Sequence, residues 1–429
     1  MDFLMSIASF LKSYIFDQPA ILLGIVALIG LIAQKKKIDE IIIGTVKSIV
    51  GFLIMSLGAN TIASSVLPIS DLLNKIMNIE TNTTGIMGQD AFISQFGSVI
   101  TIIMVFAFLI NLILARVTKF KYIYLTVHQM FWMIFVYVAV VIEAMPNISN
   151  TALIVGGSIV AGLYFTLQPA ITQPFVRKVT GGNDIAFGHT TSFGGIVSSL
   201  AGNVFKKDKD KSSESINIPD KLRFLKDITV STALVMLVLY VVCVIIAGPG
   251  YVQENVSGGT PGISWAISQA LQFAVGITVV LMGVSMMISE IIPAFKGFAD
   301  KVVPNAVPAL DCPVIFNYAP TAVMLGFLSC LVTVIVCTIL FAVTGFYALT
   351  PPVITTFFGG ATCGVFGNST GGWKGAILGG VIGGLLISFG QALTVNALSS
   401  TVADFARWSN DFDYAVFPYF VRKLLGLFG

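Results

Sequence analysis

The sequence predicts an all-α polytopic membrane protein with about eleven transmembrane helices, re-entrant hairpins and two inverted five-helix repeats. Of its 429 residues, 56% are hydrophobic and only 10% are charged, whereas soluble globular chains carry about 25% charged residues. Apolar runs of about 18 residues or more recur along the chain. The net charge of +3 is small, so nucleic-acid binding gets no support.

Eleven apolar runs are long enough to be read as membrane spans. An extended hydrophobic stretch with few charges is the usual signature of such a helix. Polar or Gly/Pro-rich stretches separate the runs, and they mark the expected ends. The expected spans are 17–33, 41–66, 97–115, 122–144, 151–173, 227–248, 264–290, 318–343, 346–367, 375–395 and 413–428.

Lysine and arginine gather in alternate loops. Lys35, Lys36 and Lys37 follow the first span, whereas the loops at 145–150 and 249–262 contain no Lys or Arg. Cytoplasmic loops carry an excess of these residues. The pattern predicts an N-terminus outside the cell and a C-terminus inside it.

The two halves of the chain show similar segments at a nearly constant offset of about 225 residues. Because five spans separate the halves, the second repeat would be inverted relative to the first, as in many transporters. We expect a first repeat at 1–180, a polar hairpin and cytoplasmic linker at 181–226, a second repeat at 227–396 and a C-terminal helix at 397–429. Val50, Gly51, Gly58, Ser64 and Pro68 recur as Val275, Gly276, Gly283, Ser289 and Pro293.

His128 is one of two histidines in the chain, and it lies inside an apolar run. Titratable groups inside membrane segments are costly and are usually functional. Trp132 follows one helical turn later on the same face, so the pair could bind a polar ring-shaped ligand. The alternative is a histidine satisfied by the backbone of a neighbouring helix.

Three further segments interrupt the apolar pattern. The stretch at 181–203 holds His189 and Thr190, and its Gly/Ser/Thr content suits a re-entrant hairpin that lines a cavity. The stretch at 303–320 is broken by prolines around Asp311, whose carboxylate can accept hydroxyl hydrogen bonds. An ordinary loop remains the alternative for both stretches. In the first half of the chain, the segment at 85–97 corresponds to the stretch at 303–320, and it contains Asp90.

Small residues fill the stretch at 355–373, "TTFFGGATCGVFGNSTGGW". Such residues let helices approach closely in membranes. Close packing alone could explain them.

Motifs for catalysis or metal binding are weak. The chain has no HExxH and no P-loop, and the spacings of its histidines and aspartates match no standard zinc pattern. We therefore expect no cofactor, no metal and no catalytic residue.

Several segments together are similar to one known family. "FKYIYLTVHQMF", "FGHTTSFG", "ALDCPVIFNYAPTAVMLGF" and "GVFGNSTGGWKGAILGG" resemble the ascorbate-specific membrane component, enzyme IIC, of the bacterial phosphoenolpyruvate-dependent sugar phosphotransferase system. The segments "LLGIVALIGLI" and "GTVKSIVGFLIMSLGA" match as well. The likeness covers nearly the whole chain in order, and the motif around Asp311 is its most specific part.

The resemblance implies a homodimer in the bacterial cytoplasmic membrane, with a scaffold and a moving core that carries substrate across by an elevator-type movement. It also implies a cytoplasmic partner, enzyme IIB, which phosphorylates the substrate and is itself supplied by enzyme IIA. Phosphoryl transfer would reside on IIB. The residues that match the family's substrate contacts are His128, His189 and Asp311, then Trp132 and Thr190 in the same motifs, and less closely Gly58, Ala59, Asp90, Ala91 and Phe92.

Two positions depart from the family pattern. Trp132 and Thr190 stand where ascorbate members have glutamine, so a related sugar or polyol is an alternative substrate. A site built to bond hydroxyl groups discriminates strongly when its partners change. Two other functions also stay open: an ion-coupled secondary transporter of the same fold, and a membrane receptor or structural protein.

Overall fold

A computed structural model gives the architecture of the chain. It describes most of the polypeptide. The described residues are 18–77, 89–208, 211–216, 220–221, 224, 227–347, 349, 351–398 and 411–425.

Helices dominate the described residues. Each half contributes one 40-residue helix with an internal proline, α3 in the first half and α10 in the second. The first half contains α2 (Pro19–Ala33), α3 (Ile38–Met77), α4 (Gln89–Val117), α5 (Val127–Ala144) and α6 (Asn150–Thr180). The rest contains α7 (Ser192–Gly202), η2 (Asn203–Asp208), η3 (Ser213–Ser215), α8 (Ile228–Ala247), α9 (Pro249–Asn255), α10 (Gly262–Lys301), α11 (Pro313–Phe316), α12 (Pro320–Thr344), α13 (Val353–Leu398) and α15 (Phe412–Leu425).

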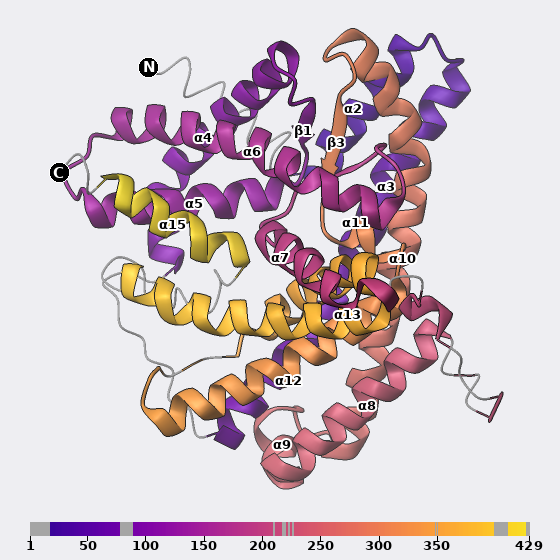
Figure 1. Ribbon diagram of the computed structural model, residues 1–429, viewed down its shortest axis with the longest axis vertical. Helices are drawn as coiled ribbons and strands as arrows, with labels where there is room; N and C mark the ends of the chain where they lie inside the picture. Colours follow the sequence, from indigo (N-terminus) through magenta and orange to yellow (C-terminus); the bar gives the residue numbers. More distant parts are fainter. Residues whose placement is uncertain are drawn as a thin grey trace.

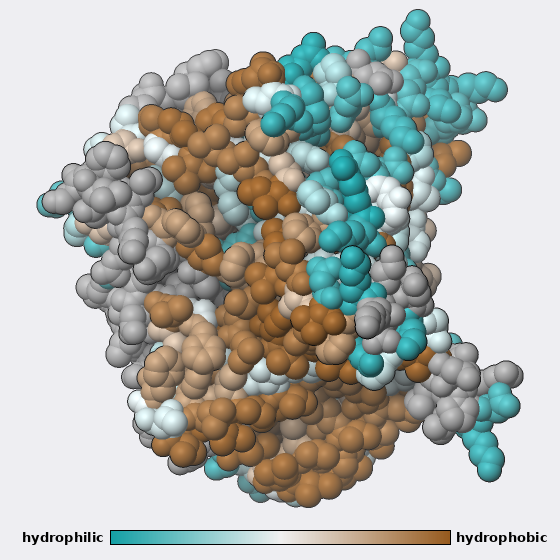
Figure 2. All heavy atoms as spheres, in the orientation of Figure 1, coloured by the Kyte–Doolittle hydropathy of each residue, from teal (hydrophilic) through white to brown (hydrophobic). Residues whose placement is uncertain are grey.

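Eight of the described helices are long and apolar enough to cross a membrane. Their outer faces carry large apolar side chains, such as Leu57 at 62% exposure and Val343 at 81%. Figure 2 shows such hydrophobic faces around α8 and α12. Because lipid is as apolar as leucine, such surfaces need no protein cover in a bilayer. The length and composition of these helices confirm the predicted class, a mainly α-helical membrane protein with many spans.

The helices form three groups in Figure 1. One group is α4, α5, α6 and α15, a second is α2, α3, α8 and α10, and a third is α7, α12 and α13, with α12 below α13 in this view. Contacts within the groups are extensive, and α15 also packs against α13, so it joins the first group to the third.

Glycines set the crossing of α3 and α10. A Cβ atom on Gly58 would lie 2.5 Å from Val280 N, and one on Gly283 would lie 2.2 Å from Met55 N. Gly51 similarly faces Met287. The partner numbers fall along one helix as they rise along the other, so the two helices run antiparallel with their backbones in close approach.

Helix α13 turns back on itself at Gly372, whose φ of 61° belongs to the left-handed region that favours glycine. Its two arms pack on each other, since a Cβ atom on Gly367 would meet Gly375 O and one on Gly379 would meet Cys363 O. The arms match the two spans expected at 346–367 and 375–395. The small residues at 355–373 do let helices approach closely.

A small parallel sheet was not predicted. It contains β1 (Tyr122–Tyr124), β2 (Ala186–Phe187) and β3 (Val307–Leu310) in the order β1-β3-β2. The span expected at 122–144 is accordingly shorter, because α5 begins only at Val127. The proline-rich stretch at 303–320 is broken as expected, into β3, α11 and the start of α12.

Part of the polar linker docks on the helices. Glu214 accepts hydrogen bonds from the backbone N–H and the hydroxyl of Thr321, both at 2.8 Å, and so caps the first turn of α12. Asn368 of α13 accepts from the backbone N–H of Ser213 at 2.9 Å. These residues therefore behave as part of the fold and not as a fully solvated loop.

Candidate functional site

The three strands bring the two histidines and one aspartate together. Asp311 follows β3 directly, and His189 follows β2 after Gly188. His128 lies in the first turn of α5, three residues beyond Leu125, whose N–H bonds Ala309 O at 3.0 Å. Because the strands are parallel, their carboxyl ends lie at one edge of the sheet, where ligands of parallel sheets commonly bind.

Asp311 lies between the two imidazole rings. Its Oδ2 is 3.5 Å from His128 Nε2 and its Oδ1 is 3.5 Å from His189 Nε2. The backbone N–H of Cys312 donates to the same Oδ1 at 2.7 Å. His128 is 45% exposed in its side chain, whereas His189 is 5% exposed. The cluster thus has one ring open to the cavity and one ring fixed in the wall.

His189 is held as a neutral ring. It lies in the connection between β2 and α7, outside the spanning helices, and burial lowers its pKa. The backbone N–H of Thr191 donates to Nδ1 at 3.1 Å. Since Nδ1 accepts this bond, the proton of the neutral ring is on Nε2, which faces Asp311 and the amide of Gln129.

A polar network ties this ring to the end of the chain. Thr190 Oγ1 lies 2.6 Å from Gln129 Oε1 and 2.5 Å from Asp411 Oδ2. A hydroxyl has one hydrogen, and the carboxylate can only accept. The Gln129 amide must therefore turn its nitrogen to Thr190 and to the Tyr414 hydroxyl, 3.0 Å away. Its oxygen then accepts from His189 Nε2, which agrees with the tautomer set by Thr191.

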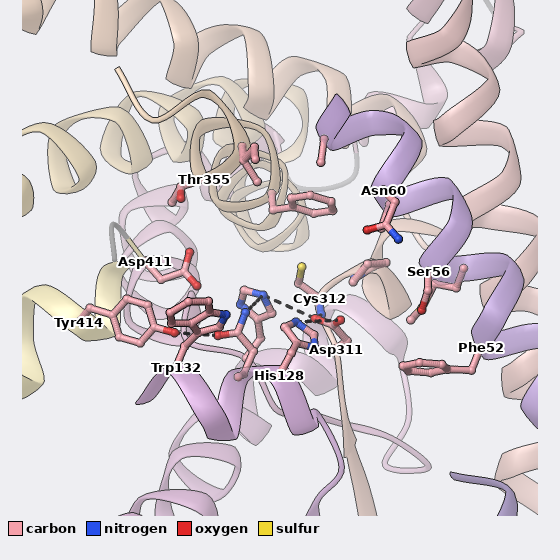
Figure 3. Close-up of a pocket in the computed structure, with 18 residues that line it drawn as sticks. Phe52, Ser56, Asn60, His128, Trp132, Asp311, Cys312, Thr355, Asp411 and Tyr414 are labelled. Carbon is pink, nitrogen blue, oxygen red and sulfur yellow. Dashed lines mark hydrogen bonds and ion pairs between the residues drawn. The ribbon is translucent and has the colours of Figure 1, made fainter. Parts of the chain in front are cut away.

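These residues open onto a cavity of about 440 Å³, between α3, α5, α13 and the start of α15 (Figure 3). Ligand sites in proteins have volumes of about 300–1,000 Å³. In Figure 3, Asp411 and Tyr414 lie on one side, and Ser56 and Asn60 lie on the other. The full lining is Phe52, Met55, Ser56, Ala59, Asn60, Ala63, His128, Gln129, Trp132, His189, Asp311, Cys312, Pro313, Ile354, Thr355, Phe358, Asp411 and Tyr414.

Two other residues singled out from the sequence reach the cavity. Trp132 and Ala59 line it, so α5 and α3 each contribute a wall. Thr190 lies behind the lining, fully buried, and contacts the cavity residues Gln129 and Asp411.

The remaining predicted positions lie elsewhere. Gly58 faces α10 at the helix crossing. Phe92 is buried against Phe135, with ring centroids 4.7 Å apart, and Ala91 is exposed on α4. The side chain of Asp90 lies outside the described part of the structure. None of these three described residues lines the cavity.

Sequence reasoning missed Gln129, Asp411 and Tyr414. The signal at the C-terminal end was "SNDFDYAVF", in which two aspartates precede an apolar run. The last expected span begins at 413, so Asp411 falls in the polar flank before it.

Asp413 holds the segment that carries His189 and Thr190. Its carboxylate accepts from the backbone N–H of Phe193 at 2.8 Å, from Ser192 Oγ at 2.7 Å and from Tyr164 Oη at 2.6 Å. The N-cap of α7, Thr191, makes no side-chain cap bond of its own. A carboxylate from α15 therefore caps α7 in its place.

Asp413→Ala is expected to lower thermal stability and weaken substrate binding together. It leaves three buried donors without an acceptor, at a cost of about 1–3 kcal/mol. Melting of the detergent-purified protein and equilibrium binding measure both effects. Tyr164→Phe, which removes one donor and leaves the carboxylate in place, is the matched control and should change both much less. Equal effects of the two variants would contradict the capping role.

The cluster also has the spacing of a metal site, because one ligand atom from each of His128, His189 and Asp311 lies within 4.8 Å of the others. A metal would need the lone pair of His189 Nε2. The Thr191 N–H instead places the proton on that nitrogen. The donor set therefore suits hydrogen bonding to a polar ligand better than a cation.

Comparison with known proteins gives two findings. Residues 14–413 match the model of the family described as the PTS system sugar-specific permease component, EIIC-GAT. The chain is also 26% identical, over an alignment of 454 residues, to a Mycoplasma pneumoniae protein named the ascorbate-specific PTS system EIIC component. That alignment covers 92% of this chain and 68% of the relative.

Proposed function

We propose a function from the premise that the chain belongs to the family of PTS sugar-specific permease components. In this proposal the protein is the membrane component that binds a sugar-like substrate outside the cell and presents it to a cytoplasmic enzyme IIB for phosphorylation. Enzyme IIA supplies IIB with phosphoryl groups. The substrate is L-ascorbate, as in the name of the Mycoplasma relative, or a related sugar or polyol.

One observation carries the proposal: His128, His189 and Asp311 meet at the ends of three strands and line a cavity of about 440 Å³. The cavity combines carboxylate acceptors and imidazole N–H donors with the indole of Trp132. A hydroxylated ring or chain offers both donors and acceptors to such groups, and its apolar face can lie on an aromatic side chain.

An elevator-type movement of one part against a dimerising scaffold is part of the proposal. The antiparallel crossing of α3 and α10 supports two inverted repeats, because Gly51 and Gly58 match Gly276 and Gly283 and lie at that crossing. Inverted repeats are common in transporters that work by alternating access.

The proposed orientation has the N-terminus outside and the C-terminus inside. Gln34, next to the first lysine cluster, donates to Pro293 O at 2.7 Å, and Lys296 lies 3.7 Å from Asp184. The lysine-bearing ends of several helices therefore gather on one side, which the positive-inside rule assigns to the cytoplasm.

Uptake into vesicles that carry the full chain tests the function. We expect uptake and phosphorylation of the substrate only when phosphorylated IIB is supplied, with no dependence on a proton gradient. His128→Ala should abolish both while the purified protein stays folded, because it removes the exposed ring of the cluster. Uptake driven by a proton gradient without IIB would overturn the proposal in favour of a secondary transporter.

A further inference from the structure

The cavity contains a second carboxylate that the sequence motifs did not indicate. Asp311 comes from the end of β3, and Asp411 comes from the residue before α15. Both line the same cavity. In Figure 3 they approach it from different elements, with Trp132 and His128 on the α5 side between them.

Asp411 is held in place and keeps capacity for a ligand. One of its oxygens accepts the Thr190 hydroxyl at 2.5 Å. A carboxylate has about four acceptor positions on its two oxygens, so further hydroxyl groups can donate to it. The residue is only partly buried, which leaves its carboxylate accessible from the cavity.

The lining offers little positive charge to balance two carboxylates. Among the lining residues that the structure describes, none is lysine or arginine. His189 is held neutral by the Thr191 N–H. Apart from His189, His128 is the one described lining residue that could carry a positive charge, and it faces Asp311. The described part of the lining is therefore acidic around Asp411.

We propose that Asp411 is a second substrate-binding carboxylate, and that with Asp311 it makes the cavity select an uncharged polyhydroxylated substrate, a sugar or sugar alcohol, over an anion such as ascorbate. The inference rests on the proposed function, because it concerns the substrate of that same site. Hydroxyl groups donate to both carboxylates, whereas an anionic ligand is repelled by them at short range.

The test is equilibrium binding to the full-length purified protein at pH 7, with compounds paired by carbon chain. Galactitol is compared with galactonate and sorbitol with gluconate, so that each pair differs mainly in charge, and ascorbate is included. The wild type should bind the better neutral compound at least about tenfold more tightly than its anionic partner, and more tightly than ascorbate. Asp411→Asn should lower this ratio by about tenfold, because it removes one charge and keeps the shape.

Asp184→Asn, at an exposed carboxylate away from the cavity, is the control and should leave the ratio unchanged. A wild-type protein that prefers the anions, or binds no neutral compound, overturns the inference, and this result does not depend on any variant being folded. An unchanged ratio in folded Asp411→Asn also overturns it. Phosphorylation by IIB is measured separately: binding of a polyol without IIB-dependent phosphorylation would count against the proposed function while supporting the charge selection.

Discussion

Asp311→Asn is expected to lower substrate affinity by about a hundredfold or more. The carboxylate lies 3.5 Å from both His128 Nε2 and His189 Nε2, so it orients both rings and also faces the cavity. Hydrogen bonds to a charged group contribute about 1.5–3 kcal/mol each, and every 1.4 kcal/mol is about a tenfold change in affinity. Asparagine keeps the size of the side chain but loses the charge and one acceptor.

Equilibrium binding of the transported compound to the purified protein measures this effect. The exposed Asp184 pairs with Lys296 at the surface, so Asp184→Asn is a matched loss of one carboxylate and should bind normally. If Asp311→Asn kept the wild-type affinity, the cluster of His128, His189 and Asp311 would not be part of the substrate site.

Gly58→Ala is expected to destabilise the protein by about 1–3 kcal/mol, the usual cost of overpacking a close contact. The new methyl group would lie 2.5 Å from Val280 N and 2.7 Å from Gly276 O, and both are backbone atoms of α10 that cannot move alone. The two helices must separate to accept it. Thermal unfolding in detergent should show a clearly lower midpoint.

Gly97→Ala in α4 is the control for this substitution. Its Cβ atom would have its closest contact at 3.6 Å, from Ile93, which is an ordinary van der Waals distance. Alanine is also the better helix former, so stability should be equal or slightly higher. If both variants melt alike, the close approach of α3 and α10 is not a stabilising contact.

Much of the fold could be predicted because a bilayer restricts what a chain can do. Apolar runs of sufficient length have to be helical, since backbone groups in lipid must bond within the segment. The turn in α13 could also be anticipated, because "STGGW" separates two apolar runs. The sheet could not be predicted, because β2 has two residues and β1 has three. Strands this short lie below the length at which periodicity distinguishes them.

Three residues of the candidate site could be predicted, because a polar or titratable side chain is energetically unfavourable in an apolar stretch. His128, His189 and Asp311 interrupt apolar or small-residue stretches, and such groups need a physical reason to be there. Asp411 carries no such signal, because it lies where a polar flank is expected. Its contact with Thr190 exists only after α15 packs beside α7, and nothing local in either segment encodes that approach.

The capping of α7 by Asp413 has a consequence for the order of assembly. Translation proceeds from the N-terminus, so α5, α6 and the histidines are made long before the residues that fix His189 and Thr190. Until then the donors at the start of α7 lack their acceptor. Contacts between distant parts of a chain form late, and the binding cavity therefore matures only when the last helix arrives. A chain that stops before residue 411 would contain most of its helices yet leave the cavity unfinished, because the acceptors on Asp411 and Asp413 would be missing.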